Sequence, residues 1–143
     1  MNSKQRYFAT LDGKPTDFIP RLPILMQFAA EYIGSNYGAF ASDYKILTEA
    51  NIACARDFGI DQMNTMSDPY RETQGYGATI IYQKDGVPYC EKHPLEDDDA
   101  LEALDQLPRP DPMQAERMRD RIEAVRTYAE TVGDTHSIMG WVE

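Results

Sequence analysis

The residues best suited to chemistry are Ser67 and Asp68, which follow a short run at residues 60–66 and precede Pro69. The run has the length and composition of a short β-strand, so the pair is expected on the loop beyond the strand's end. A carboxylate in that place accepts hydrogen bonds from N–H donors and stabilises positive charge. Asp68 also has a simpler alternative role, because aspartate often caps a turn.

Cysteine and histidine are the other residue types that matter for chemistry. Cys90 and His93 form a Cys-x-x-His pair, but two ligands are too few for a closed metal site. Cys54 lies on the apolar side of a predicted helix and is expected to be a buried thiol. The sequence therefore predicts neither a metal site nor a disulfide framework in this chain.

The loop that carries Ser67 and Asp68 is positioned by a predicted helix that leads directly into the strand before it. Asp43 is a suitable N-cap for a helix over residues 44–58, and Gly59 is suited to end it. Apolar residues of this helix share one face at spacings of three and four. The strand follows almost without a loop, which is typical of repeated helix–strand units.

Two further strands are expected. The apolar run at residues 21–28 has strand length, and it places Met26 and Gln27 at the strand's end. The other strand covers residues 136–142, where the chain stops. Since that strand has the composition of a core strand, we expect the chain to be the N-terminal part of a longer protein. Short helices are predicted at residues 4–11, 29–34 and 98–107.

The longest predicted helix lies before the last strand. Asp111 and Pro112 are suited to its N-cap and first position, and Gly133 is suited to end it. Its predicted buried face is an apolar stripe at steps of four, three, four and three, which consists of Met118, Ile122, Val125, Ala129 and Val132.

An Asp85-Gly86 turn between β-rich runs at residues 78–83 and 87–90 predicts a β-hairpin. The remaining strands are separated by helices, which favours parallel pairing through crossover connections. One α/β domain over residues 1–143 is therefore expected, as the beginning of either a doubly wound sheet or a (β/α)8 barrel.

The bulk composition excludes several classes of partner. The formal net charge is −10, which argues against nucleic acid and anionic membrane surfaces. The sequence contains neither a membrane-length apolar segment nor a signal peptide. A cytoplasmic protein is therefore expected.

The chain resembles the uroporphyrinogen decarboxylase superfamily, which also holds the cobamide-dependent methyltransferases. The order and spacing of several short segments over nearly the whole chain make this resemblance specific. The matching segments are residues 11–20, Asp43-Tyr44, residues 58–61, Ser67-Asp68-Pro69 with Glu72 and Gly75, Pro94-Leu95, Asp111-Pro112, Arg117-Met118, and residues 140–143.

This resemblance implies the N-terminal portion of a (β/α)8 TIM barrel with an inserted β-hairpin, whose site lies at the carboxyl ends of the strands. It implies that Asp68 is catalytic, because the matching aspartate of the decarboxylases contacts the pyrrole nitrogens of the substrate. Ser67, Met26 and Gln27 are then expected to bind substrate. The decarboxylases resemble one another in an arginine-rich segment that binds substrate carboxylates, whereas this chain has Gln27-Phe28 there.

The missing arginines favour the corrinoid-dependent methyltransferase type, with a uroporphyrinogen decarboxylase of porphyrin biosynthesis as the alternative. Zinc and a corrinoid are expected only for a complete barrel, and this chain alone is expected to bind no cofactor and to be inactive. A second hypothesis is a non-catalytic module that associates with itself or with another protein. The partners expected are a second copy, the C-terminal half of the barrel, or a corrinoid protein.

Overall fold

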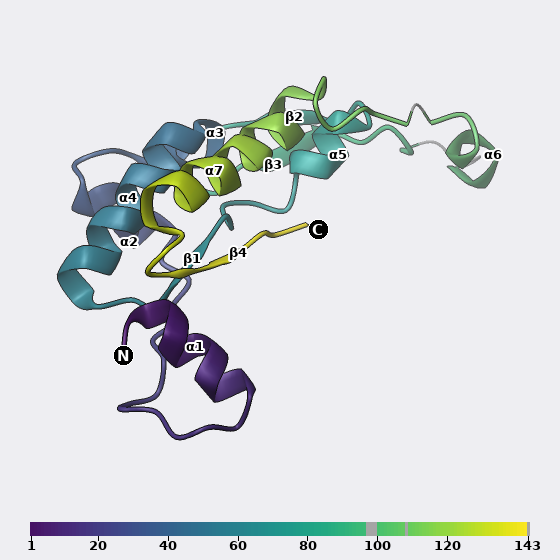
Figure 1. The fold of residues 1–143 in the computed structure, drawn as a ribbon. Helices are drawn as coiled ribbons and strands as arrows, with labels where there is room; N and C mark the ends of the chain where they lie inside the picture. Colours follow the sequence, from purple (N-terminus) through teal and green to yellow (C-terminus); the bar gives the residue numbers. More distant parts are fainter. Residues whose placement is uncertain (97–99, 108, 143) are drawn as a thin grey trace.

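The computed structural model describes residues 1–96, 100–107 and 109–142 (Figure 1). Its helices are α1 (Ser3–Leu11), α2 (Gln27–Tyr32), α3 (Tyr37–Ser42), α4 (Tyr44–Phe58), α5 (Arg71–Gly75), α6 (Ala100–Leu104) and α7 (Glu116–Val132). Its strands are β1 (Gln62–Asn64), β2 (Thr79–Ile81), β3 (Tyr89–Lys92) and β4 (Ser137–Met139). The predicted helix at 98–107 is represented by α6, and its first two residues lie outside the described ranges.

The strand before the Ser67–Asp68 loop, β1, pairs in parallel with β4. Gln62 lies opposite Ser137, and Asn64 lies opposite Met139. The chain between these strands includes α7, so the parallel pair with a helical connection is confirmed, although both strands are shorter than predicted. Figure 1 shows the β1–β4 pair beneath α4 and α7, with α1 below the pair.

The strand predicted over residues 21–28 is wrong, because residues 21–25 lie outside both sheets and α2 begins at Gln27. The segment does reach β1's edge: the Asp61 N–H donates to the Arg21 carbonyl at 2.9 Å. Pro20 and Pro23 supply no N–H donors for a longer ladder. Met26, with a φ of 46°, then turns the chain into α2.

The strands β2 and β3 form a separate antiparallel pair. Ile80 lies opposite Cys90, and the register shifts between Thr79 and Ile80. The Asp85-Gly86 dipeptide lies in the connection between the two strands. This pair therefore stands apart from the parallel strands rather than extending them.

The predicted bounds and caps of α4 are confirmed. The Asp43 carboxylate accepts a hydrogen bond from the Lys45 N–H at 2.8 Å, and Gly59 ends the helix with a φ of 65°. Leu47 and Cys54 are fully buried on its inner face. Burial also raises the pKa of the Cys54 thiol.

The long helix α7 differs from its prediction at both its start and its face. It begins at Glu116, because Asp111 instead closes a turn in which its carboxylate accepts from the Met113 N–H at 2.9 Å. Its buried residues are Arg117, Arg121, Ala124 and Tyr128. The predicted apolar stripe is half-buried or exposed instead. The helix is thus turned so that arginines point inward.

The core combines apolar packing with one buried hydrogen-bond network. Tyr128, fully buried on α7, donates to the Asn64 carbonyl of β1 at 3.1 Å. It accepts from the Asn51 amide of α4 at 2.9 Å. One hydroxyl therefore joins the two long helices to the strand that carries the Ser67–Asp68 loop.

We predict that Tyr128→Phe lowers the free energy of unfolding by about 1–2 kcal/mol, because the Asn51 amide and Asn64 carbonyl each lose a buried partner. Urea unfolding followed by circular dichroism measures the change. Tyr89→Phe is the matched control, since Tyr89 is 43% exposed. Equal stability of the two variants would contradict the role of this network.

The helix α1 is held to β1 by ion pairs of Arg6. Its guanidinium lies 2.5 Å from the buried Asp61 carboxylate and 2.6 Å from Asp17. Hydrogen bonds from Arg6 lower the pKa of Asp17 to about 2. Folding is therefore coupled to the ionisation of Asp17.

A carboxyl group with a lowered pKa stabilises the fold above its unfolded-state pKa, and this contribution is lost as the pH falls through the folded-state value. We predict that stability falls between about pH 4 and pH 2, and that Asp17→Asn makes this dependence shallower. Thermal unfolding at several pH values measures it. Asp12→Asn, at an exposed Lys14 pair, is the control. An unchanged pH dependence in Asp17→Asn would refute the coupling.

Candidate functional site

The side chain of Ser67 is the centre of a buried polar cluster. Its hydroxyl donates to the Asp68 carboxylate at 2.6 Å. It accepts from Arg71 of α5 at 2.9 Å and from Arg121 of α7 at 2.7 Å. The Tyr37 hydroxyl also donates to the Ser67 carbonyl. Elements that are distant in sequence therefore meet at one small side chain.

The carboxylate of Asp68 lies within the same cluster and is only 2% exposed. It accepts from the Tyr70 N–H at 3.1 Å, so its alternative role in a turn is present. Guanidinium nitrogens of Arg71 and Arg117 lie 3.7 Å from its other oxygen. Its proposed catalytic role stays a prediction, and its surroundings are those of a residue that holds cations in place.

Three buried arginines, Arg71, Arg117 and Arg121, were not predicted as site residues. Arg117 donates to the Tyr82 hydroxyl at 2.8 Å and lies 3.0 Å from the Asp120 carboxylate. The sequence signals were the Arg117-Met118 segment of the family resemblance and the four-residue spacing of Arg117 and Arg121. That spacing is equally typical of a solvated helix face. Their burial depends on partners far away in the sequence, which periodicity does not reveal.

The electrostatics of this cluster follow from its burial. Burial and the neighbouring cations Arg71 and Arg117 lower the pKa of Arg121 to about 9, so the group is still protonated at neutral pH. Burial and the nearby Asp68 carboxylate raise the pKa of Tyr37 to about 12. Both shifts indicate a site with little access to water.

The other two predicted substrate-binding residues, Met26 and Gln27, lie at the start of α2. Met26 is half-buried against the apolar core. The exposed Gln27 amide donates to Glu31 on its own helix at 2.7 Å. The structure therefore directs the Gln27 amide to its own helix and not to Ser67 or Asp68. A substrate-binding role for the pair remains a prediction.

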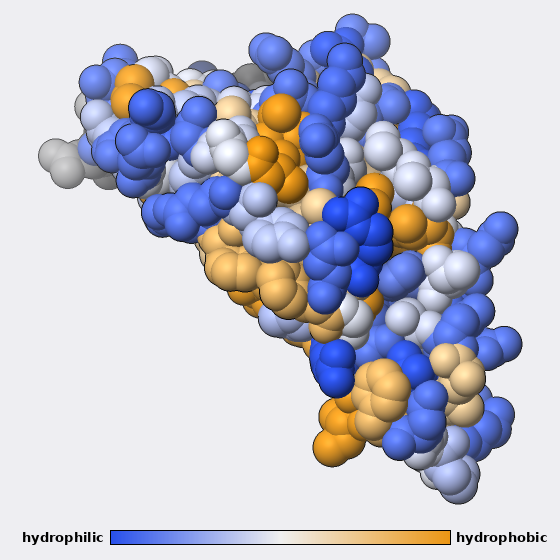
Figure 2. Space-filling model, turned by 90° about the vertical axis from the view of Figure 1, so that its left-hand side faces the viewer, coloured by the Kyte–Doolittle hydropathy of each residue, from blue (hydrophilic) through white to orange (hydrophobic). Residues whose placement is uncertain are grey.

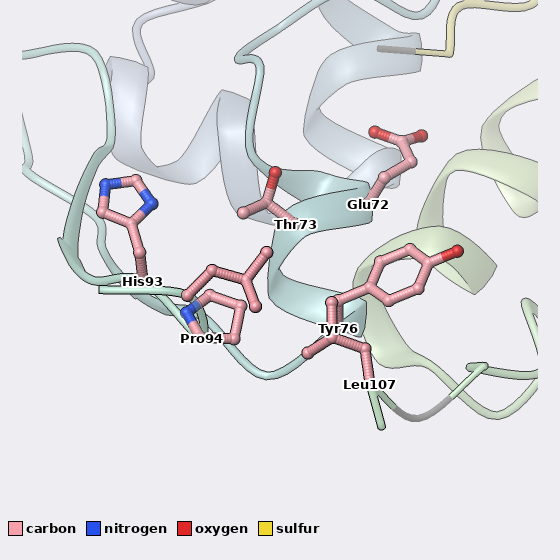
Figure 3. A pocket seen from close by; sticks show the side chains of 7 residues that line it. Glu72, Thr73, Tyr76, His93, Pro94 and Leu107 are labelled. Carbon is pink, nitrogen blue, oxygen red and sulfur yellow. The ribbon is translucent and has the colours of Figure 1, made fainter. Parts of the chain in front are cut away.

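Two hollows flank α5. A groove of about 520 Å³ lies between α5, α7 and residues 140–142, with Met118, Arg121, Ile122 and Trp141 in its walls. A hollow of about 370 Å³ on the other side is lined by residues that include His93, Pro94 and Leu107 (Figure 3). Glu72 and Tyr76 line both. Figure 3 shows these two side chains extending from the same side of α5, away from His93.

Cys90 is a half-buried residue of β3 and His93 is exposed just after the strand, with Sγ and Nδ1 3.4 Å apart. In the described ranges, no group of three or more His, Cys, Asp or Glu side chains is placed to hold a metal ion. The same ranges contain no helix that is long and apolar enough to cross a membrane.

This arrangement of helices and strands also occurs in a longer solved protein. The chain is similar to a solved structure described as a methyltransferase from Methanosarcina mazei, with a TM-score of 0.80 and 20% sequence identity. The match covers 100% of this chain and 42% of that one. At this identity the likeness shows the fold, and this chain spans less than half the length of that protein.

The sequence identifies the family more directly. The family model described as uroporphyrinogen decarboxylase (URO-D) matches residues 2–143. The chain therefore belongs to the uroporphyrinogen decarboxylase family, and the predicted resemblance is confirmed. No curated protein matches the sequence.

We predict that Ser67→Ala lowers the free energy of unfolding by about 2–3 kcal/mol, because buried guanidinium groups of Arg71 and Arg121 lose their acceptor. Ser42→Ala is the control, since Ser42 is exposed and bonds only to the Gly38 carbonyl of its own helix. We expect this control to change stability by about 0.5 kcal/mol or less. Chemical denaturation of both variants provides the comparison, and a small effect of Ser67→Ala would show that the cluster does not depend on the hydroxyl.

Proposed function

We propose that this chain is the N-terminal part of a (β/α)8 barrel that transfers a methyl group between a corrinoid and a thiol or similar acceptor. Family membership and the likeness to a methyltransferase support the enzymatic class. The parallel pair β1–β4, with α7 in its connection, is the arrangement expected of consecutive barrel strands. In this proposal the Ser67–Asp68 loop lies at the end of the barrel that carries the site.

We choose this reaction type because the start of α2 contains no arginine. A decarboxylase that acts on a porphyrinogen requires several cations for the carboxylates of its substrate, and the segment after Met26 offers Gln27 instead. Buried arginines do occur nearby, but Arg71 and Arg117 are engaged with Ser67, Asp68 and Asp120. The described part of the chain therefore offers no cluster of cations suited to a polycarboxylate.

The cofactors of a complete barrel would be held mainly outside this chain. Cys90 and His93 supply only two donors at the end of β3, which does not fit a zinc site. We assign no step of the reaction to a metal or a corrinoid through residues of this chain. We propose that the role of Asp68 in the site is to keep Arg71 and Arg117 in position.

A second candidate function is association through apolar surface. Several large apolar side chains are exposed on the segment before α2 and at the end of β4, among them Ile19 at 85% and Val142 at 82%. Figure 2 shows apolar surface in the middle of one face and at the end near α1. Surfaces of this kind are usually covered by another protein part. We propose that the C-terminal half of a barrel, or a second copy, covers them.

We infer the cellular location from the state of the two cysteines. Cys54 and Cys90 are both free cysteines. Reduced cysteines are the usual state in a cytoplasm, which is where we propose that the protein acts.

The proposal is tested by assaying the 143-residue chain and a complete protein that contains it, with methylcobalamin and 2-mercaptoethanol as methyl donor and acceptor. Mass spectrometry of the methyl thioether is the readout. We expect the product only with the complete protein, because the chain supplies only part of a barrel. A parallel assay with uroporphyrinogen tests the alternative reaction.

Formation of coproporphyrinogen without any thioether would overturn the proposed reaction type in favour of a decarboxylase. Turnover by the short chain alone would overturn its assignment as an incomplete site. If neither assay gives product and light scattering shows a stable homodimer of the short chain, the association function is favoured instead.

A further inference from the structure

The groove between α5, α7 and residues 140–142 contains a buried cation with unused hydrogen-bonding capacity. Arg121 is 5% exposed, and its Nη2 donates to the Ser67 hydroxyl at 2.7 Å. Its Nε and Nη1 atoms are buried and have no hydrogen-bond partner. Arg121 also forms no salt bridge within the described residues, whereas Arg117 lies 3.0 Å from Asp120. A buried guanidinium in this state is costly unless an anion reaches it.

The remaining walls of the groove are mainly apolar. Met118 and Ile122, which belong to the predicted apolar stripe of α7, form one wall, and Trp141 is part of another. The volume of about 520 Å³ lies within the usual range for sites that bind small molecules. Arg126 also lines the groove, but it is 56% exposed and pairs with Glu123. Apolar walls around one buried cation are suited to a ligand with an apolar body and a single anionic group.

A carboxylate of the protein also faces this groove. Glu72 lines it from α5, and its Oε2 atom is buried without a hydrogen-bond partner. Because Glu72 is negatively charged, it opposes the binding of anions while Arg121 favours it. The two residues therefore give opposite and separable contributions to the affinity for an anion.

We propose that this groove binds a small organic monocarboxylate, whose anionic group pairs with Arg121 and whose apolar part packs on Ile122 and Trp141. This ligand site is additional to the proposed methyl transfer and does not depend on it. One buried cation without a salt bridge among the described residues suits one carboxylate, and this distinguishes the site from a receptor for polycarboxylates. The ligand's carboxylate supplies the anionic partner that Arg121 lacks among the described residues.

The position of Trp141 makes the proposal measurable, because it is the chain's one tryptophan and lines the groove. Phenylacetate and its neutral analogue phenylacetamide are titrated into the 143-residue chain while tryptophan fluorescence is recorded. We expect saturable quenching or enhancement with phenylacetate, and binding of phenylacetamide that is weaker by about tenfold or more. Equal affinities for the two probes would overturn the proposal.

Arg121→Gln tests the assigned cation. We expect it to weaken phenylacetate binding by about tenfold and to leave phenylacetamide within about twofold. Arg119→Gln is the matched control on the same helix, since Arg119 is exposed and does not line the groove. It should change neither affinity by more than about twofold. An unchanged phenylacetate affinity in Arg121→Gln would refute the site.

Glu72→Gln keeps the test decisive if Arg121→Gln fails to fold, which far-UV circular dichroism would reveal. Removal of the negative charge should tighten phenylacetate binding by about threefold or more, and leave phenylacetamide within about twofold. Unchanged or weaker phenylacetate binding in a folded Glu72→Gln variant would count against a carboxylate in this groove. These measurements do not involve methyl transfer, so failure here is distinguishable from failure of the proposed function.

Discussion

The burial of three guanidinium groups around Ser67 and Asp68 is the constraint on which the rest of this structure depends. Arg71 and Arg121 share the Ser67 hydroxyl, while Arg117 reaches Asp68, Asp120 and the Ala41 carbonyl. Charged groups removed from water require such partners, so helices α5 and α7 have little freedom to rotate relative to the loop after β1. The orientation of α7, and with it the exposure of its apolar stripe, follows from this requirement.

The network at Tyr128 performs the corresponding role at the other end of α7. Its hydroxyl meets Asn51 of α4 and the backbone of β1, three turns along the helix from Arg117. Two polar contacts on one face therefore fix both the rotation and the position of α7. The groove that contains Arg121 and Trp141 is a result of this placement, because the apolar side chains of α7 are left facing residues 140–142.

The parts of the fold that could be predicted are those governed by local sequence. Asp43 and Gly59 define the ends of α4, since capping and a left-handed glycine act within a few residues. The failed predictions depended on distant partners or on missing donors. Prolines prevented a strand over residues 21–28, and the inward face of α7 is set by Ser67, 54 residues before Arg121. The position of Asp68 on the loop after β1 was predicted correctly. Its cationic neighbours on α7 were not, because helical periodicity places Arg117 and Arg121 on a solvent-exposed face.

The ionic interior also has a thermal consequence. Exposure of apolar surface on unfolding raises the heat capacity, whereas exposure of polar surface lowers it. Unfolding of this chain exposes the buried Arg71, Arg117 and Arg121 together with Asp68, in place of the aliphatic side chains that a helix–strand interface usually contains. The heat-capacity increment is therefore smaller than an apolar interior of equal area would give. The stability of the fold accordingly varies less steeply on either side of its temperature of maximum stability.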